Sequence, residues 1–336
     1  MENEQKLSPA DTQTSSLRSV WRGLKLHPTV WKPTGDPKAL LCVCHGVGEY
    51  MGRYDELGCH LTHSGVLVFG HDHVGNGQSE GDRVHVEDID TYVQDVIAHI
   101  ELMRKRYPAL PCILLGHSMG GLVAAHVAIQ RHDLFTALIL SAAAAELEGT
   151  FSYWIVKKMV QLLSNVAPQL GLRNLNPNDI SSIPEEVERY ANDPLVWHGP
   201  WKAGWGAAMM ESITLLRENA ARISLPLLLM HGSEDNLVPI TASHFINDNA
   251  TSQEKKFEVF EGSHHETLHD KEQERARELI KEWVLSHLTA AQVTEPHSQS
   301  DSSAETETAR QQAQEEIVKG SKQPGSAENT SVTDSL

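Results

Sequence analysis

The stretch that decides the fold is Leu114-Leu115-Gly116-His117-Ser118-Met119-Gly120-Gly121. The apolar residues 112–115 predict a buried strand, and the small apolar residues 122–128 predict a tightly packed helix. The Gly-x-Ser-x-Gly pattern between them is typical of a strand-to-helix elbow that lifts the serine hydroxyl above the edge of a sheet. Such a turn strains the serine backbone and brings strand and helix close together, so a Cβ at Gly116 or Gly120 would clash. Ser118 is therefore the candidate nucleophile.

Strands and helices alternate along most of the chain. Apolar runs predict strands over residues 39–44, 66–70, 112–115, 137–140, 226–230 and 257–260. Apolar positions spaced by three and four predict helices over 89–100 and 276–284. Alternation of this kind indicates the α/β class, with a mostly parallel central sheet covered by helices on both faces. Ahead of it, alternating polarity over residues 20–31 predicts a solvent-edged hairpin.

Three regions fall outside this rhythm, and they set the expected domain organisation. Residues 145–215 contain helical stretches but no evident strand, so we expect a lid inserted into an α/β domain spanning 17–288. Residues 1–16 are polar, and residues 289–336 are rich in Ser, Thr, Gln and Glu. Both segments are predicted to be disordered, because neither can bury enough apolar surface to offset its ordering entropy.

Composition excludes several classes of protein. The 336 residues carry a formal net charge of −17, which argues against a nucleic-acid partner. The four cysteines (Cys42, Cys44, Cys59, Cys112) are too few for a disulfide framework in a chain of this size and are expected to be free thiols. No secretory signal pattern is evident, and no apolar run approaches the roughly 20 residues that span a bilayer. A cytoplasmic protein, soluble or peripherally bound to membranes, is expected.

A serine hydroxyl needs an imidazole base and an acid that orients it, and in elbow-type hydrolases these follow in the order Ser, acid, His. The acid should follow the strand at 226–230, where Glu234 and Asp235 stand, and the pattern favours Asp235. The base should follow the strand at 257–260, where the pattern alone does not separate His264 from His265.

An oxyanion hole requires two backbone N–H groups aimed at the developing negative charge. Met119, directly after the nucleophile, should supply one, and Val47 in the turn His45-Gly46-Val47-Gly48 is the favoured second donor. His71-Asp72-His73 lacks the further ligands of a metal site, and a serine triad needs no metal. We expect neither metal nor cofactor.

With these residues placed, the chain resembles the monoacylglycerol lipases of the α/β-hydrolase fold. The resemblance covers about residues 17–288 and rests on the blocks 45–50, 72–81 and 115–121. It implies the triad Ser118, Asp235 and His265, favouring His265 over His264, with Val47 and Met119 as oxyanion donors. It also implies hydrolysis of monoacylglycerols to a fatty acid and glycerol, with the head group bound by Glu49, Arg53, His117 and Tyr190. Carboxylate acceptors and hydroxyl or guanidinium donors suit a buried diol.

The resemblance further implies an apolar lid helix, at about residues 153–166, that contacts membranes. This stretch contains Tyr153, Trp154, Ile155, Val156, Lys157, Lys158, Met159, Val160, Leu162, Leu163 and Val166. Reactive cysteines known near the pocket in some relatives are not matched, since Val238 and Trp197 stand in the corresponding places. Trp197, His198 and Trp201 make the cap bulkier, which leaves the acyl-chain preference open.

Other functions stay open from the sequence. One is a related lysophospholipase, carboxylesterase or acyltransferase, for which His265 and Asp270 fit a His-x4-Asp pattern. Another is a binding protein on the same fold without catalysis. The oligomeric state, including a homodimer, is also undetermined.

Overall fold

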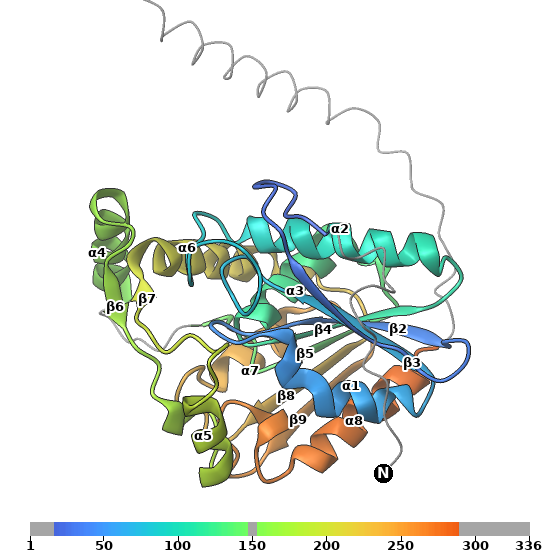
Figure 1. Ribbon diagram of the computed structural model, residues 1–336. Helices are drawn as coiled ribbons and strands as arrows, with labels where there is room; N and C mark the ends of the chain where they lie inside the picture. The colour runs from blue at the N-terminus through green and yellow to red at the C-terminus, as the bar shows by residue number, and fades with distance from the viewer. Residues whose placement is uncertain (1–16, 147–152, 289–336) are drawn as a thin grey trace, which may run out of the picture. The chain divides into compact units, whose positions relative to one another are not determined.

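A central sheet of seven strands runs in the order β1-β3-β2-β4-β5-β8-β9, and every neighbouring pair is parallel except β1 with β3 (Figure 1). The computed structural model describes residues 17–146 and 153–288, without the side chains of 153–158. The strands are β1 (His27–Trp31), β2 (Ala39–Cys44), β3 (Val66–Asp72), β4 (Cys112–His117), β5 (Ala137–Ser141), β8 (Leu227–Gly232) and β9 (Lys255–Phe260). The predicted α/β class is confirmed. The segments 1–16 and 289–336, predicted to be disordered, lie outside the described residues.

Helices cover both faces of the sheet because its buried strands are apolar on both sides. Leu40 and Cys42 of β2 pack in one cluster with α2 (Asp90–Arg106), α3 (Met119–Gln130), α6 (Ala203–Asn219) and α7 (Thr241–Asn249). Leu41 and Val43, one position along, pack on the opposite face with α1 (Asp55–Thr62) and α8 (Gln273–Ser286). Short 3₁₀ turns occur at Met51–Tyr54, His132–Leu134, Pro177–Asp179, Ala220–Arg222 and Thr267–His269.

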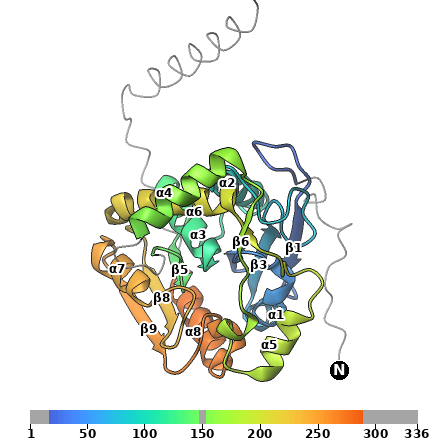
Figure 2. The same cartoon turned by 90° about the vertical axis from the view of Figure 1, so that its left-hand side faces the viewer.

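Between β5 and β8 the chain leaves the sheet and forms a cap. The cap contains α4 (Tyr153–Val166), β6 (Gly171–Arg173), α5 (Pro184–Ala191) and β7 (Trp201–Lys202), which lie at one end of the sheet (Figures 1 and 2). The expectation of no strand here was wrong, because β6 and β7 pair antiparallel. Strands of three and two residues are too short to leave a periodic signal in the sequence.

The predicted hairpin at residues 20–31 was also wrong. Arg18 and Lys25 form only an isolated bridge, and β1 pairs with the edge of β3 instead. Pairing with β3 covers the edge of the parallel sheet, which an exposed hairpin would leave open. The four cysteines are free thiols, as expected, and only Cys59 is partly exposed.

Candidate active site

Ser118 lies between β4 and α3 in a backbone conformation that L-residues rarely adopt, with φ of 55° and ψ of −121°. A Cβ added at Gly116 would lie 2.2 Å from the carbonyl oxygen of Gly120, and one added at Gly120 would lie 2.0 Å from that of Cys44. No real Cβ tolerates such distances, so both glycines are required by close packing of α3 against β4 and β2. The strained elbow stands where the sequence predicts it.

Asp235 and His265 come from loops after two neighbouring parallel strands, β8 and β9. Carboxyl ends of parallel strands meet at one edge of a sheet, so the two loops converge although the residues are 30 positions apart. His265 Nδ1 lies 2.6 Å from Asp235 Oδ2, and the ring of His265 packs 4.8 Å from the ring of His117, the neighbour of Ser118. The arrangement brings an acid, a base and a serine to one edge.

The geometry also separates the alternatives left by the sequence. Glu234 is exposed, and its amide donates to the Ser263 carbonyl rather than bringing its carboxylate to a histidine. The ring of His264 lies 3.1 Å from the Asn178 carbonyl, facing the cap. Only Asp235 and His265 form a buried carboxylate–imidazole pair among these four residues.

Charge balance in this pair favours an ionised acid and a basic imidazole. Burial alone would raise the pKa of Asp235, but His265 and a hydrogen bond from His231 hold it well below its usual value. Burial alone would lower the pKa of His265, yet the Asp235 carboxylate outweighs it and raises that pKa above its usual value of 6.5. By contrast, burial beside His265 lowers the pKa of His117 to about 4. His117 is therefore neutral near pH 7.

The loop after β2 supplies an amide suited to an oxyanion hole. The amides flanking Val47 are occupied, because Gly46 N donates to Glu49 Oε1 at 2.5 Å and Gly48 N donates to Asn76 Oδ1 at 3.0 Å. Within the described part of the chain, the amides of Val47 and Met119 have no acceptor. A Cβ on Gly46 would lie 3.3 Å from Ser118 Cβ, so this loop adjoins the serine.

A buried charge cluster lies next to the triad. Arg53 Nε donates to Glu49 Oε2 at 3.2 Å, and Arg53 Nη2 pairs closely with Glu266 Oε2. His269 closes the cluster, with Nδ1 lying 3.0 Å from Glu266 Oε2 and Nε2 lying 2.9 Å from the Arg53 carbonyl. The Arg53 guanidinium also lies 4.7 Å from the centre of the Tyr190 ring. Burial alone would raise the pKa of Glu266, but Arg53 holds it well below its usual range.

The structure thus brings together the four predicted head-group residues. Glu49 and His117 line a small cavity of about 10 Å³, room for about one water-sized group. Arg53 pairs with Glu49, the Tyr190 ring lies against the Arg53 guanidinium, and Tyr54 donates to Glu49 Oε1 at 2.9 Å. Sequence reasoning missed Glu266 and His269. A signal was present, because Glu266 directly follows His265 and His269 comes three residues after Glu266, at the end of the 3₁₀ turn Thr267–His269.

Asp270, of the His-x4-Asp pattern, has a structural role. Its carboxylate accepts hydrogen bonds from the amides of His264 at 2.7 Å and Ser182 at 3.1 Å, and from the Ser182 hydroxyl. Asp270 is fully buried. It therefore ties the cap segment before α5 to the loop that carries His265, and nothing in these contacts favours the acyltransferase reading.

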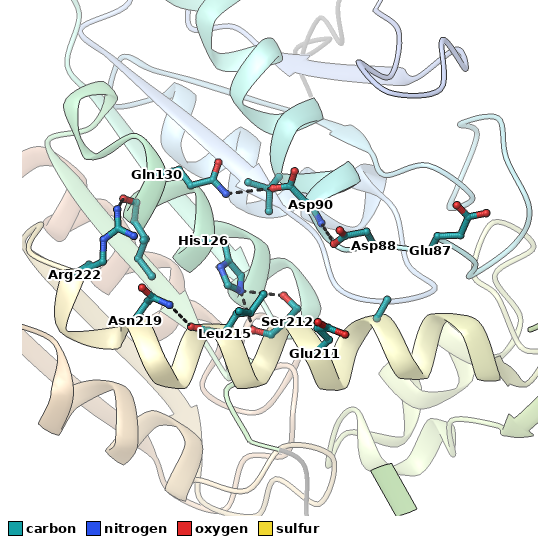
Figure 3. A pocket seen from close by; sticks show the side chains of 13 residues that line it. Glu87, Asp88, Asp90, His126, Gln130, Glu211, Ser212, Leu215, Asn219 and Arg222 are labelled. Carbon is teal, nitrogen blue, oxygen red and sulfur yellow. Dashed lines mark hydrogen bonds between the residues drawn. The ribbon is translucent and has the colours of Figure 1, made fainter. Parts of the chain in front are cut away.

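A larger cavity of about 400 Å³ lies between α2, α3 and α6 (Figure 3). His126 at its centre hydrogen-bonds Ser212 at 3.0 Å, and the rim is acidic, with Glu87, Asp88 and Asp90. Ser118, Asp235 and His265 do not line it. Among the residues described, no group of three or more His, Cys, Asp or Glu side chains is arranged to hold a metal ion.

On the described part of α4, apolar side chains face outward. Met159, Leu162 and Val166 are 58%, 66% and 78% exposed, whereas Val160 is buried. The side chains of the expected apolar residues Tyr153 to Val156, and of Lys157 and Lys158, lie outside the described residues. In the part of the chain that the structure describes, no helix combines the length and apolarity needed to cross a bilayer.

Comparison with known proteins places the chain among hydrolases of this fold. A family described as "Serine aminopeptidase, S33" matches residues 35–272. The monoglyceride lipase of Homo sapiens is 37% identical over 273 residues, covering 79% of this chain and 88% of that protein. The monoglyceride lipase of Mus musculus is 36% identical over 264 residues, covering 78% and 87%. The crystal structure of the Paleococcus ferrophilus monoacylglycerol lipase superposes with a TM-score of 0.70 at 28% identity, covering 78% of this chain and 99% of that one.

Proposed function

This chain belongs to the serine aminopeptidase S33 family and is a serine hydrolase of the lipase and esterase type, and we propose that it hydrolyses monoacylglycerols. Monoglyceride lipases are among its relatives. The products would be a free fatty acid and glycerol. The observation that carries the proposal is the buried pair of Asp235 and His265, 2.6 Å apart, at the sheet edge where Ser118 is held in a strained elbow and its neighbour His117 packs against the His265 ring. Relatives named for this activity supply the substrate class.

In the proposed mechanism Asp235 orients His265 and stabilises its charged form. His265 takes the proton of Ser118, whose oxygen attacks the ester carbonyl, and the amides of Met119 and Val47 hold the oxyanion. His265 then protonates the leaving glycerol oxygen and afterwards activates a water that releases the fatty acid from the acyl-enzyme. The free amides of Val47 and Met119 support this assignment.

The charge cluster supports a polar end to the pocket. Three donors already bind Glu49: the Gly46 amide, the Tyr54 hydroxyl and Arg53. A carboxylate has about four acceptor positions, so Glu49 keeps room for one substrate hydroxyl. The proposed pocket joins Glu49 to Arg53, His117 and Tyr190, and it would favour a glycerol head group over a bulky charged one.

The exposed apolar side chains of α4 support peripheral contact with membranes. Met159, Leu162 and Val166 present an apolar surface that an interfacial helix would bury in a lipid boundary. A substrate with a long acyl chain resides in the bilayer, so a cap in contact with that boundary places the site where the substrate is.

The pH dependence of catalysis follows from His265. The imidazole must be neutral to accept the serine proton, and Asp235 raises its pKa above the usual 6.5. We therefore expect kcat/KM to rise with pH through an apparent pKa above about 6.5 and then to level off. A pH profile on a water-soluble short-chain ester measures this without interfacial effects. An acidic limb well below pH 6 would contradict the pairing of Asp235 with His265.

Substrate class is tested by fatty-acid release from three lipids with the same acyl chain. We expect monoacylglycerol to be cleaved with a kcat/KM at least about 100-fold above that of the lysophospholipid or the triacylglycerol, since a lost head-group hydrogen bond leaves buried polar groups unpaired. Preference for the lysophospholipid would keep the triad and refute the head-group pocket. Failure to cleave any ester, with no labelling by a fluorophosphonate, would favour a non-catalytic binding protein.

A further inference from the structure

A second histidine contacts the acid of the triad. His231 is the penultimate residue of β8 and is completely buried. Its Nε2 lies 3.2 Å from Asp235 Oδ2 and 3.0 Å from the Val238 carbonyl oxygen. Its Nδ1 lies 2.7 Å from the hydroxyl of Ser243 on α7. His231 thus bridges the core of the domain and the acid loop.

The neighbours of His231 determine where its hydrogen lies. A carbonyl oxygen can only accept, and Asp235, whose pKa is held low, is an ionised acceptor as well. Both groups near Nε2 are therefore acceptors, so Nε2 carries the hydrogen. In the neutral ring Nδ1 is then an acceptor, and the buried Ser243 hydroxyl donates to it. Every polar atom of this chain of contacts has a partner.

The two carboxylate oxygens of Asp235 have different polar neighbours. Oδ1 accepts from the amides of Leu237 at 2.8 Å and Val238 at 3.0 Å, which fix the carboxylate to its own loop. Oδ2 is shared by the two histidines, His265 at 2.6 Å and His231 at 3.2 Å. The oxygen that faces the proposed base therefore has a second N–H nearby, which His231 shares between Asp235 and the Val238 carbonyl, its closer acceptor at 3.0 Å.

We propose that His231 is a positioning residue of the triad, which orients Asp235 and limits how strongly this carboxylate stabilises the charged form of His265. The inference rests on the proposed function for its catalytic meaning. A donor on Oδ2 withdraws negative charge from the bond to His265, so its loss leaves Asp235 more basic and more strongly attached to the imidazolium. His265 would then give up its proton less readily to a leaving group.

The other groups that act on His265 do not change when His231 is replaced. His117 packs against the ring, and the carboxylates of Glu266 and Glu49 act on it from the charge cluster. None of these three contacts His231 among the hydrogen bonds and ion pairs of the described residues. A change in the titration of His265 would therefore report the contact between His231 Nε2 and the Asp235 carboxylate.

Two substitutions separate positioning from packing. The side-chain amide nitrogen of His231→Gln reaches the place of Nε2 and keeps one N–H for Asp235, whereas His231→Leu fills similar volume without a donor. For His231→Leu we expect the acidic limb of kcat/KM to move up by about 0.5–1 pH unit and kcat to fall about tenfold, as for loss of one hydrogen bond to a charged group. His231→Gln should keep the wild-type profile, and KM should change little in either variant.

Titration of the His265 ring by NMR gives the same comparison without a substrate. We expect the pKa of His265 to be higher in His231→Leu than in the wild type even if the protein hydrolyses no ester. Failure of this proposal and failure of the proposed function are therefore distinguishable. Ser243→Ala, which removes the donor to Nδ1, should shift the titration in the same direction by less and serves if His231→Leu does not fold. An unmoved titration in His231→Leu, or in Ser243→Ala when it must stand in, would overturn the proposal. Equal shifts in the Gln and Leu variants would also overturn it.

Discussion

Ser118→Ala is expected to lower kcat/KM for every ester that the protein hydrolyses by about 10⁴–10⁶-fold. The hydroxyl is the group that would form the acyl-enzyme, and no other serine shares the elbow between β4 and α3. The proposed oxyanion amides and head-group pocket remain in the variant, so we expect a small residual rate over water to persist. Initial rates on a soluble ester measure the effect, at a pH above the acidic limb of the kcat/KM profile that we assign to His265.

The stability of Ser118→Ala should equal that of the wild type, because alanine at position 118 keeps the same φ of 55° as serine. Ser118→Gly should instead stabilise the fold by about 1 kcal/mol, since glycine adopts this backbone without strain. Ser263→Ala is the matched control: it removes another buried hydroxyl two residues from His265, one without a partner among the described residues. We expect nearly wild-type activity for it. Substantial turnover by Ser118→Ala would contradict the elbow assignment.

Arg53→Met is expected to destabilise the protein by about 3–5 kcal/mol. The arginine side chain is 6% exposed and lies between two carboxylates that are 4% and 6% exposed. Methionine fills much of the same space but removes the guanidinium that balances the buried carboxylates of Glu49 and Glu266. Chemical denaturation at neutral pH measures the loss, with unchanged m-values showing that the unfolding reaction is the same.

The loss of stability in Arg53→Met should be smaller at lower pH. In the wild-type protein Glu266 has a lowered pKa, so its stabilising contribution is present above the unfolded value of about 4.5 and is lost as the pH falls through the folded pKa. In Arg53→Met the unpaired carboxylate is expected to have a raised pKa, so protonation stabilises the folded variant as the pH falls. The difference between the two proteins is therefore expected to be smaller at pH 5 than at pH 8.

Arg131→Met is the matched control, because Arg131 also lies between two carboxylates. Its Nη1 lies 2.5 Å from Glu101 Oε1 and its Nε lies 2.9 Å from Asp133 Oδ1, but all three side chains are at least 33% exposed. Exposed ion pairs contribute about 0–1 kcal/mol, so this variant should lose little. Equal losses in Arg53→Met and Arg131→Met would show that burial of the charge cluster does not matter.

Most of the architecture could be read from local patterns. The elbow at Gly116-His117-Ser118-Met119-Gly120 combines a buried strand, a strained serine and two glycines that admit no Cβ, and each requirement is met within a few residues. The parallel sheet could be predicted because each apolar strand and each amphipathic helix is likewise marked by a pattern within its own residues. The hairpin at 20–31 and the strands β6 and β7 were misjudged because their pairing depends on distant partners rather than on their own period.

The sequence by itself determined the fold class, and it predicted the loops that carry the proposed serine, acid and base. Only the tertiary structure decided which side chains meet within those loops. It separated Asp235 from Glu234, paired Arg53 with Glu266 across 213 positions, and placed His231 on the acid of the triad. Backbone geometry and hydrophobic period are local properties of a chain, whereas a buried charge takes its partner from whatever the packing of the sheet brings beside it.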